Sequence, residues 1–300
     1  MKIVIYPEYD LWNFALRSLK DEANIELYPL NNYCSLPQIA LRRAIPSYKA
    51  PSSFLIGRRL RERLLMLKDD DSIILCDYIK NVGFLAAISR CVQAKIPLHL
   101  WLWNPINDYE PYFSKHKDEI EELGFTIHTF DKKNAEIFKL QYHKQFFPIR
   151  VYQKISTSNI YWTDFYFLGA EKGRTHILNE ISNTLSGYCL DFRIAKNISE
   201  YITYDENIKN VIHTRCVVDI VQSNQSDISL RPLEAMAFRK KLLTNNLSIL
   251  NADFYNRDNI FVIGHDDWAD IDSFLKRPYV VVDDKILRSY DVLTWINDFK

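Results

Sequence analysis

Residues 217–246, VVDIVQSNQSDISLRPLEAMAFRKKLLTNN, decide the fold of this chain. The apolar beginning is typical of a buried strand, the polar middle of a loop, and the end of a second strand. Between them the sequence predicts a helix over residues 231–238, which Ser229 or Asp227 can cap and in which Pro232 suits the first turn. Two strands joined by a helix are the repeating unit of a parallel sheet.

The rest of the chain alternates in the same way, with short runs rich in valine and isoleucine between longer helical patterns. Residues 150–163 are irregular and polar, and we take them as the linker between a domain of residues 1–150 and a domain of residues 151–300. The sequence therefore predicts an α/β protein of two Rossmann-like, doubly wound domains that face a cleft. We expect the last helix to pack back on the amino-terminal domain.

One candidate binding loop follows a predicted strand at residues 164–168. Gly169 and Gly173 enclose a tight loop that carries Lys172 and leads through Arg174 into a helix. Backbone N–H groups at a helix start, with two cations beside them, suit a diphosphate. The spacing matches neither the Walker A loop nor GxGxxG, so a plain strand-to-helix turn with surface cations is an equal alternative.

A second candidate element lies in the opening stretch, beyond a predicted strand at residues 188–194 and a predicted helix at about 198–207. Arg231 stands three residues before Glu234, which places a cation at the helix start and a carboxylate one turn on. Such a pair suits the phosphates and ribose hydroxyls of a nucleotide, but the acid is equally explained by the helix dipole or by pairing with the arginine. Further candidates for binding the same nucleotide, on the approach to the helix, are Gln222, Gln225, Ser229 and Leu230.

Basic residues are concentrated in residues 39–68, although the whole chain carries 38 basic and 38 acidic side chains. This segment holds one acid, Glu62, against Arg42, Arg43, Lys49, Arg58, Arg59, Arg61, Arg63 and Lys68. We expect Arg42, Arg43, Arg58 and Arg59 to face an acceptor or a membrane surface, with a solvated helical face as the alternative. Nucleic-acid binding is disfavoured because no recognised nucleic-acid module accompanies the basic residues.

Cysteine and histidine spacing argues against disulfides and metals. The five cysteines have no CxxC pattern, which fits a reducing cytosol, and the seven histidines show no zinc spacing. The DxD at residues 69–71 precedes its strand, so we assign it to a turn and expect no metal or other cofactor. We do not expect the start, MKIVIYPEYD, to act as a signal peptide, because its apolar run is short and is broken by Pro7, Glu8 and Asp10. No run approaches the roughly 18 apolar residues of a membrane span. We expect a cytoplasmic protein whose membrane contact is at most peripheral, at the inner face.

The segment LRPLEAMAFRKKLLTNN resembles the glutamate-containing motif of the GT-B glycosyltransferases. Together with LWLWNPI, HTFDKKNAE, FYFLGAEKGR and DFYNRDNIFVIG, it resembles glycosyltransferase-like proteins of bacterial capsule and lipopolysaccharide clusters over residues 72–300. The resemblance implies that Glu234 holds the donor ribose and that Arg174, Lys172 and Arg231 are candidates for the diphosphate. The loop SNQSDISLRP departs from the pattern, because many members carry a glycine between the glutamine and the helix.

The resemblance implies metal-independent transfer of a sugar from a nucleotide-sugar donor to a surface polysaccharide, lipopolysaccharide or other lipid-linked acceptor. An inverting reaction needs a base on the acceptor hydroxyl. Asp77 is the first candidate because it follows a strand, and Asp10 and Glu8 come next, although each also suits a loop or capping role. Two alternatives stay open: a catalytically silent nucleotide- or glycan-binding protein, and a nucleotide-sugar epimerase. Donor, acceptor, anomeric outcome and oligomeric state are not determined by the sequence.

Overall fold

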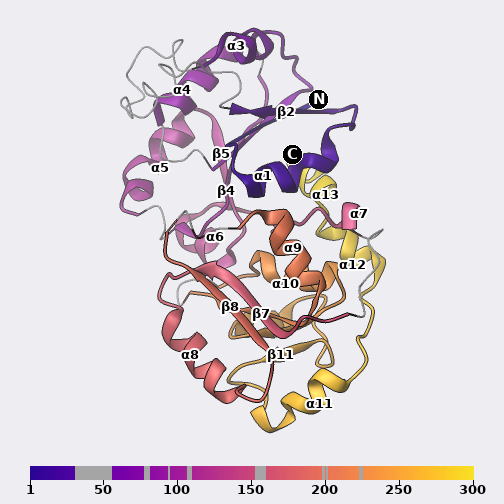
Figure 1. The fold of residues 1–300 in the computed structure, drawn as a ribbon. Coiled ribbons are helices and arrows are strands. Elements are labelled where there is room, and N and C mark those ends of the chain that lie inside the picture. Colours follow the sequence, from indigo (N-terminus) through magenta and orange to yellow (C-terminus); the bar gives the residue numbers. More distant parts are fainter. Residues whose placement is uncertain are drawn as a thin grey trace. The chain divides into compact units, whose positions relative to one another are not determined.

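The computed structural model describes residues 1–30, 56–77, 82–93, 95–106, 110–152, 160–197, 200, 202–222 and 226–300. The chain divides into two compact units, and Figure 1 colours the first indigo to magenta except for its yellow carboxyl-terminal residues, and the second pink to yellow. The first unit is Met1–Lys144 together with Ile296–Lys300, and the second is Gln145–Trp295. Each is built on one parallel sheet with interleaved helices, which confirms the predicted fold class.

The first unit contains a six-stranded parallel sheet in the order β2-β1-β3-β4-β5-β6. Its strands are β1 (Lys2–Tyr6), β2 (Ile25–Pro29), β3 (Ser72–Cys76), β4 (Leu98–Leu102), β5 (Phe125–Thr129) and β6 (Gln141–Tyr142). Its described helices include α1 (Asp10–Leu16), α3 (Arg58–Leu65), α4 (Val82–Cys91), α5 (Tyr112–Glu122) and α6 (Lys132–Phe138). The strand order reverses between β1 and β3, as in other doubly wound sheets.

Alternation along β4 separates the two faces of this sheet. Leu98, Leu100 and Leu102 belong to the core that α3, α4 and α5 cover. Since successive side chains of a strand point to opposite faces, His99 faces the other side. There its ring lies 5.2 Å from the ring of Phe299, and Lys2 Nζ donates a hydrogen bond of 2.5 Å to the Phe299 carbonyl. The last residues of the chain therefore pack on the second face of the first sheet.

The second unit contains a five-stranded parallel sheet in the order β11-β10-β9-β7-β8. Its strands are β7 (Thr163–Ala170), β8 (Leu190–Ala195), β9 (Thr214–Asp219), β10 (Lys241–Thr244) and β11 (Ile260–Val262). Its helices include α7 (Ile149–Tyr152), α8 (Thr175–Thr184), α9 (Tyr204–Ile212), α10 (Leu230–Ala237), α11 (Ile271–Lys276) and α12 (Asp284–Ser289), and α13 (Val292–Asn297) runs from this unit into the first. The order reverses between β7 and β9, so their carboxyl ends form the switch point where such sheets bind ligands.

The two faces of the second sheet carry different helices, as Figure 1 shows. Phe165 and Phe167 of β7 pack into a core with residues of α8 and α11. Tyr166 points to the opposite face, where its hydroxyl donates a 3.0 Å hydrogen bond to Asn207 of α9. Helices α9 and α10 lie together on that side. The predicted binding helix α10 is therefore next to α9.

Two element boundaries differ from the sequence prediction. Gly169, expected in a loop, lies inside β7 because it pairs with Ile194 of the neighbouring strand. The helix expected at about residues 198–207 is α9, which begins at Tyr204. Thr203 caps it, since its hydroxyl accepts a hydrogen bond from the backbone N–H of Glu206 at 3.2 Å. A threonine followed three residues later by a glutamate is a helix-start signal that the prediction overlooked.

Within the described part of the chain, none of the helices combines the length and apolar character that crossing a membrane requires. Cys76, Cys91, Cys189 and Cys216 are free thiols, and Cys34 lies outside the described residues.

Candidate functional site

Asp219, the last residue of β9, holds the switch point of the second sheet together. Its side chain is fully buried. Oδ1 accepts hydrogen bonds from Ser229 Oγ at 2.7 Å and from Arg231 Nη1 at 3.3 Å, and Oδ2 accepts one from Thr244 Oγ1 at 3.1 Å. The carboxylate thus joins the end of β9 to the start of α10 and the end of β10. A buried acid with a paired arginine and two further donors satisfies the requirement for burying charge.

The start of α10 is positioned by these contacts instead of by a local cap. Ser229 occupies the N-cap position, but its side chain makes no capping hydrogen bond and donates to Asp219. Asp227, the alternative cap, accepts from the neighbouring N–H of Ile228 at 2.8 Å. Of the other predicted residues, Leu230 begins α10 and Gln222 is half-buried, and Gln225 lies outside the described residues.

Two arginines predicted to bind the diphosphate lie at the carboxyl ends of β7 and β9. Arg231 donates from Nε and Nη2 to the carbonyl of Leu168 at 3.1 and 2.7 Å. Arg174 donates from Nε to the carbonyl of Ile220 at 2.7 Å and from Nη1 to that of Ala170 at 2.9 Å. Both guanidinium groups therefore place positive charge at the switch point while several of their donors bind the protein's own backbone.

Gly169 is explained by the close approach of one of these arginines. A Cβ atom on Gly169 would lie 2.5 Å from Arg231 Nη2 and 3.0 Å from Cζ of Phe167. The guanidinium carbon of Arg231 lies 4.9 Å from the centre of the Phe167 ring. The glycine thus provides the space in which Arg231 reaches Leu168 and Asp219.

The predicted phosphate loop holds a carboxylate of its own. Glu171 accepts hydrogen bonds from the backbone N–H of Gly173 and from Thr175 Oγ1, each at 2.9 Å. These bonds lower the pKa of Glu171. Lys172 and Gly173 are exposed and adopt left-handed backbone angles, with φ of 38° and 76°. Glu171, which sequence reasoning missed, therefore binds N–H and hydroxyl donors at the start of α8.

Glu234 is buried between α10 and α9, with 3% of the residue exposed. Its Oε1 accepts a short hydrogen bond from the Tyr204 hydroxyl and one of 3.4 Å from Asn207 Nδ2. Burial raises the pKa of Glu234, while the Tyr204 hydrogen bond and the charge of Arg231 oppose that rise. Tyr204 and Asn207 were missed because the start of α9 was placed too early. The capping signal at Thr203 would have put both residues in the first turn of that helix.

The candidate bases of the first unit lie at one edge of its sheet. Asp77 directly follows β3 with a positive φ of 58°, and its N–H donates to the Trp101 carbonyl at 2.9 Å. Glu8 lies between β1 and α1, and Asp10 is the first residue of α1. Because β1 and β3 are paired in parallel, all three acids follow carboxyl ends of neighbouring strands. Their role as a base stays a prediction.

The described part of the basic segment forms α3. Arg58 and Arg59 are exposed, and Arg58 Nε pairs with Glu62 at 2.7 Å. Leu65 and Met66, near the end of the helix, are also exposed, by 42% and 68%. Arg42 and Arg43 lie outside the described residues.

Among the residues that the structure describes, none of the His, Cys, Asp and Glu side chains form a group of three or more that could hold a metal ion. The acidic residues 69–71 lead into β3, and Asp71 Oδ1 pairs with the amino-terminal ammonium at 2.9 Å. A metal-independent site stays a prediction.

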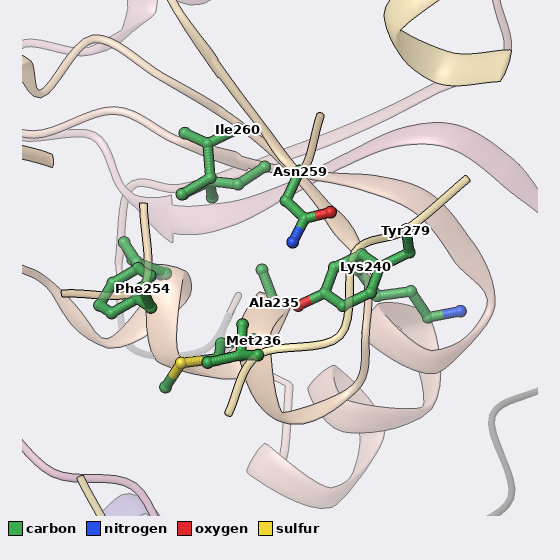
Figure 2. Close-up of a pocket in the computed structure, with 10 residues that line it drawn as sticks. Ala235, Met236, Lys240, Phe254, Asn259, Ile260 and Tyr279 are labelled. Atoms are coloured by element: carbon green, nitrogen blue, oxygen red, sulfur yellow. The ribbon is translucent and has the colours of Figure 1, made fainter. Parts of the chain in front are cut away.

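A small pocket lies against a different side of α10 (Figure 2). Pro232, Ala235 and Met236 line it, and these residues lie on one face of α10 because they are three and four positions apart. Figure 2 shows the Tyr279 hydroxyl directed into the pocket and the Lys240 ammonium directed away from it. Burial lowers the pKa of Lys240 to about 8. The lining residues include none of the predicted site residues, so this pocket is separate from the switch point.

Comparisons with known proteins show a shared fold. No protein-family model and no curated protein sequence matches the chain. The structure is similar to the apo form of the lipopolysaccharide outer core galactosyltransferase WaaB, at 10% identity and a TM-score of 0.50, over 100% of this chain and 98% of that one. It is also similar to an alpha-glucosyltransferase in complex with UDP and a 13-mer DNA containing an A:G mismatch, at 11% identity and a TM-score of 0.57, over 98% and 91% of the two chains. Both are GT-B glycosyltransferases, so the chain has the GT-B fold.

Proposed function

We propose that the protein is a glycosyltransferase that uses a nucleoside-diphosphate sugar. Two observations support this proposal: the GT-B fold, and the buried carboxylate of Glu234 close to the switch point of the second sheet. Arg231 and Asp219 both act on the pKa of Glu234, which places the three side chains in one electrostatic neighbourhood. The observation that carries the proposal is this buried acid under the influence of Arg231, with Arg174 at the same switch point, where doubly wound sheets bind nucleotides.

In the proposed complex, Glu234 accepts hydrogen bonds from the donor ribose. Lys172 is the cation best placed for direct contact with the diphosphate because it is exposed on its turn. Arg174 and Arg231 act mainly through their charge, since their described hydrogen bonds bind protein acceptors. Glu171 must turn aside if a phosphate binds at the start of α8, because two anions cannot share the same donors.

Transfer then consists of attack by an acceptor hydroxyl on the anomeric carbon. The bond from that carbon to the diphosphate breaks, and its electron pair leaves with the diphosphate, whose negative charge the cations stabilise. A base takes the acceptor proton if the configuration inverts, and Asp77 is our first candidate, followed by Asp10 and Glu8. We propose no metal ion for this step.

We propose a bacterial surface polysaccharide, lipopolysaccharide or other lipid-linked glycan as the acceptor. The printed function of WaaB, a lipopolysaccharide outer core galactosyltransferase, and the exposed arginines of α3 support this choice. Arg58 and Arg59, with the exposed Leu65 and Met66 on the same helix, would meet an anionic acceptor or membrane surface. The silent binding protein is the alternative, and donor hydrolysis without acceptor separates the two.

Thermal unfolding in the presence of UDP-, GDP- and TDP-sugars tests the proposal, with a CMP-sugar, which carries a single phosphate, as the contrast. A ligand at 100 times its Kd stabilises the folded state by about 2.7 kcal/mol, which corresponds to a rise of about 5 °C in Tm. We expect one nucleotide class to produce this rise and Glu234→Ala to abolish it. The matched control is Glu180→Ala on the exposed surface of α8, which should respond like the unchanged protein. The absence of any response, or an unchanged response in Glu234→Ala, contradicts the proposed site.

A further inference from the structure

The carboxylate of Glu234 is closed off by a hydroxyl group of the protein itself. The Tyr204 hydroxyl donates to Oε1, and Asn207 Nδ2 approaches the same oxygen at 3.4 Å. Only 3% of Glu234 is exposed. A nucleotide therefore cannot reach this oxygen with its ribose hydroxyls while Tyr204 keeps its present position.

The two partners of Glu234 differ in how deeply they are buried. Asn207 is buried, and its side chain oxygen accepts a 3.0 Å hydrogen bond from Tyr166, whose hydroxyl also accepts one of 3.4 Å from Asn210. Tyr204 is half-buried and is the first residue of α9. Asn207 therefore belongs to the fixed inner wall of the site, and Tyr204 covers the acid from the side nearer to solvent.

The Tyr204 hydroxyl and a ribose hydroxyl are chemically alike as partners of Glu234. A buried carboxylate requires hydrogen-bond donors, and the phenol hydroxyl offers one O–H, as each ribose hydroxyl does. We infer that the Tyr204 hydroxyl occupies the position of a ribose hydroxyl, and that nucleotide binding at Glu234 exchanges the tyrosine for the sugar. This inference rests on the proposed function, because it requires a nucleotide at Glu234. Under this inference, the Tyr204 hydroxyl competes with the ribose of the nucleotide for Glu234 and so lowers the affinity for the donor. The described conformation, in which Tyr204 binds Glu234, is then the donor-free state.

Titration calorimetry with UDP and with GDP, on the unchanged protein and on Tyr204→Phe, tests the exchange. The phenylalanine keeps the ring and removes the competing O–H, so the bound nucleotide no longer has to break the hydrogen bond between Tyr204 and Glu234. We expect the Kd to fall about tenfold. The matched control is Tyr188→Phe, a half-buried tyrosine before β8 that packs on Phe165, and its Kd should stay unchanged.

A second ligand separates competition from a general structural effect. The 2′,3′-dideoxy form of the nucleotide has no ribose hydroxyl for Glu234, so its Kd should be the same in Tyr204→Phe and in the unchanged protein. Equal or weaker binding of the complete nucleotide to Tyr204→Phe overturns the inference and leaves the proposed function standing. A change of equal size for the dideoxy form overturns it as well. If neither protein binds UDP or GDP and none of the sugar nucleotides of the thermal screen raises the Tm, the proposed nucleotide site itself fails.

Discussion

Each of the two units contains a buried polar cluster, and the two clusters differ in whether they hold a charge. The Asp219 cluster of the second unit consists of Asp219, Ser229, Arg231 and Thr244. The histidine cluster of the first unit consists of His99, His128 and His143, packed against Phe299. In the Asp219 cluster a buried charge is retained because a cation and two hydroxyls bind it. In the histidine cluster the rings pack against one another and against Phe299, and burial disfavours the charged forms of His99 and His128.

The histidine cluster is incompletely hydrogen-bonded. His99 Nδ1 and His128 Nε2 lie 3.0 Å apart, so one of these nitrogens donates to the other. His99 Nε2 and His128 Nδ1 are buried, and neither has a hydrogen-bond partner. Whichever neutral ring donates, the accepting ring carries its proton on its other nitrogen, where it meets no acceptor. Burial, Lys2 and His143 lower the pKa of His99 to about 4, and burial, His99 and His143 lower that of His128 to about 3.

The difference predicts which perturbation destabilises each cluster. A paired buried charge is sensitive to loss of one partner, because the other charge is then left without compensation. A neutral buried imidazole is sensitive to acid, because the unfolded chain accepts a proton that the folded protein refuses. The second unit should therefore respond most to substitution and the first to pH.

The largest effect is expected from Asp219→Ala. Removing the carboxylate leaves Arg231 without its counter-charge and deprives Ser229 and Thr244 of their acceptor, so the free energy of unfolding should fall by about 3 kcal/mol. Urea unfolding followed by circular dichroism measures the loss. Asp219→Asn keeps an acceptor oxygen and should lose less. A loss below about 1 kcal/mol in Asp219→Ala would show that the ion pair between Asp219 and Arg231 contributes little to the stability of the protein.

A smaller loss is expected from Gly169→Ala. The new methyl group would overlap Arg231 Nη2, which must move away from Leu168 and Asp219. Overpacking of this kind costs about 2 kcal/mol. Gly187→Ala is the matched control, because no atom lies within 4 Å of the added Cβ, and its effect should stay within about 0.5 kcal/mol. Equal stability of the two variants in urea would contradict the close approach of Arg231.

The smallest effect is expected from mild acid acting on the histidine cluster. The folded-state pKa values lie below the unfolded value of about 6.5, so this stability is complete above pH 6.5 and is lost as the pH falls toward 4. Each histidine contributes a slope of about 1.4 kcal/mol per pH unit at most. Urea unfolding between pH 7 and pH 6 measures the slope, and over this range the two histidines together should cost about 1.4 kcal/mol. It should flatten in His99→Leu/His128→Leu and persist in His176→Leu, whose side chain is 86% exposed. An unchanged slope in the double variant would assign the acid sensitivity to other groups.

Much of the fold could be predicted because it depends on local patterns. The continuous apolar run of β3, SIILC, is buried on both faces, as expected for a strand of a parallel sheet. The helix expected at residues 231–238 is α10, within one residue at each end. The start of α9 was missed although Thr203 and Glu206 signalled it. Gly169 was wrongly placed in a loop, because its pairing with Ile194 of the neighbouring strand cannot be seen in the sequence.

The candidate site was predictable in its residues but not in their contacts. A glutamate one turn into a helix, with an arginine before it, is visible in the sequence. The partners of that arginine are the Leu168 carbonyl, 63 residues earlier, and Asp219, 12 residues earlier. No sequence spacing encodes these distances, because they arise when β7 and β9 become neighbours.

By itself, the sequence determined that this protein is built from two parallel α/β sheets, and it determined which short stretches supply the polar residues of the candidate site. Hydrophobic periodicity and helix-capping chemistry act over a few residues, so they can be seen in one dimension. The tertiary structure alone decided that Glu234 is covered by Tyr204, that Asp219 secures Arg231, and that Glu171 binds the donors at the start of α8. Except for the local turn at Glu171, these contacts join residues 12 and 30 positions apart, which meet only when the sheet and its helices have assembled.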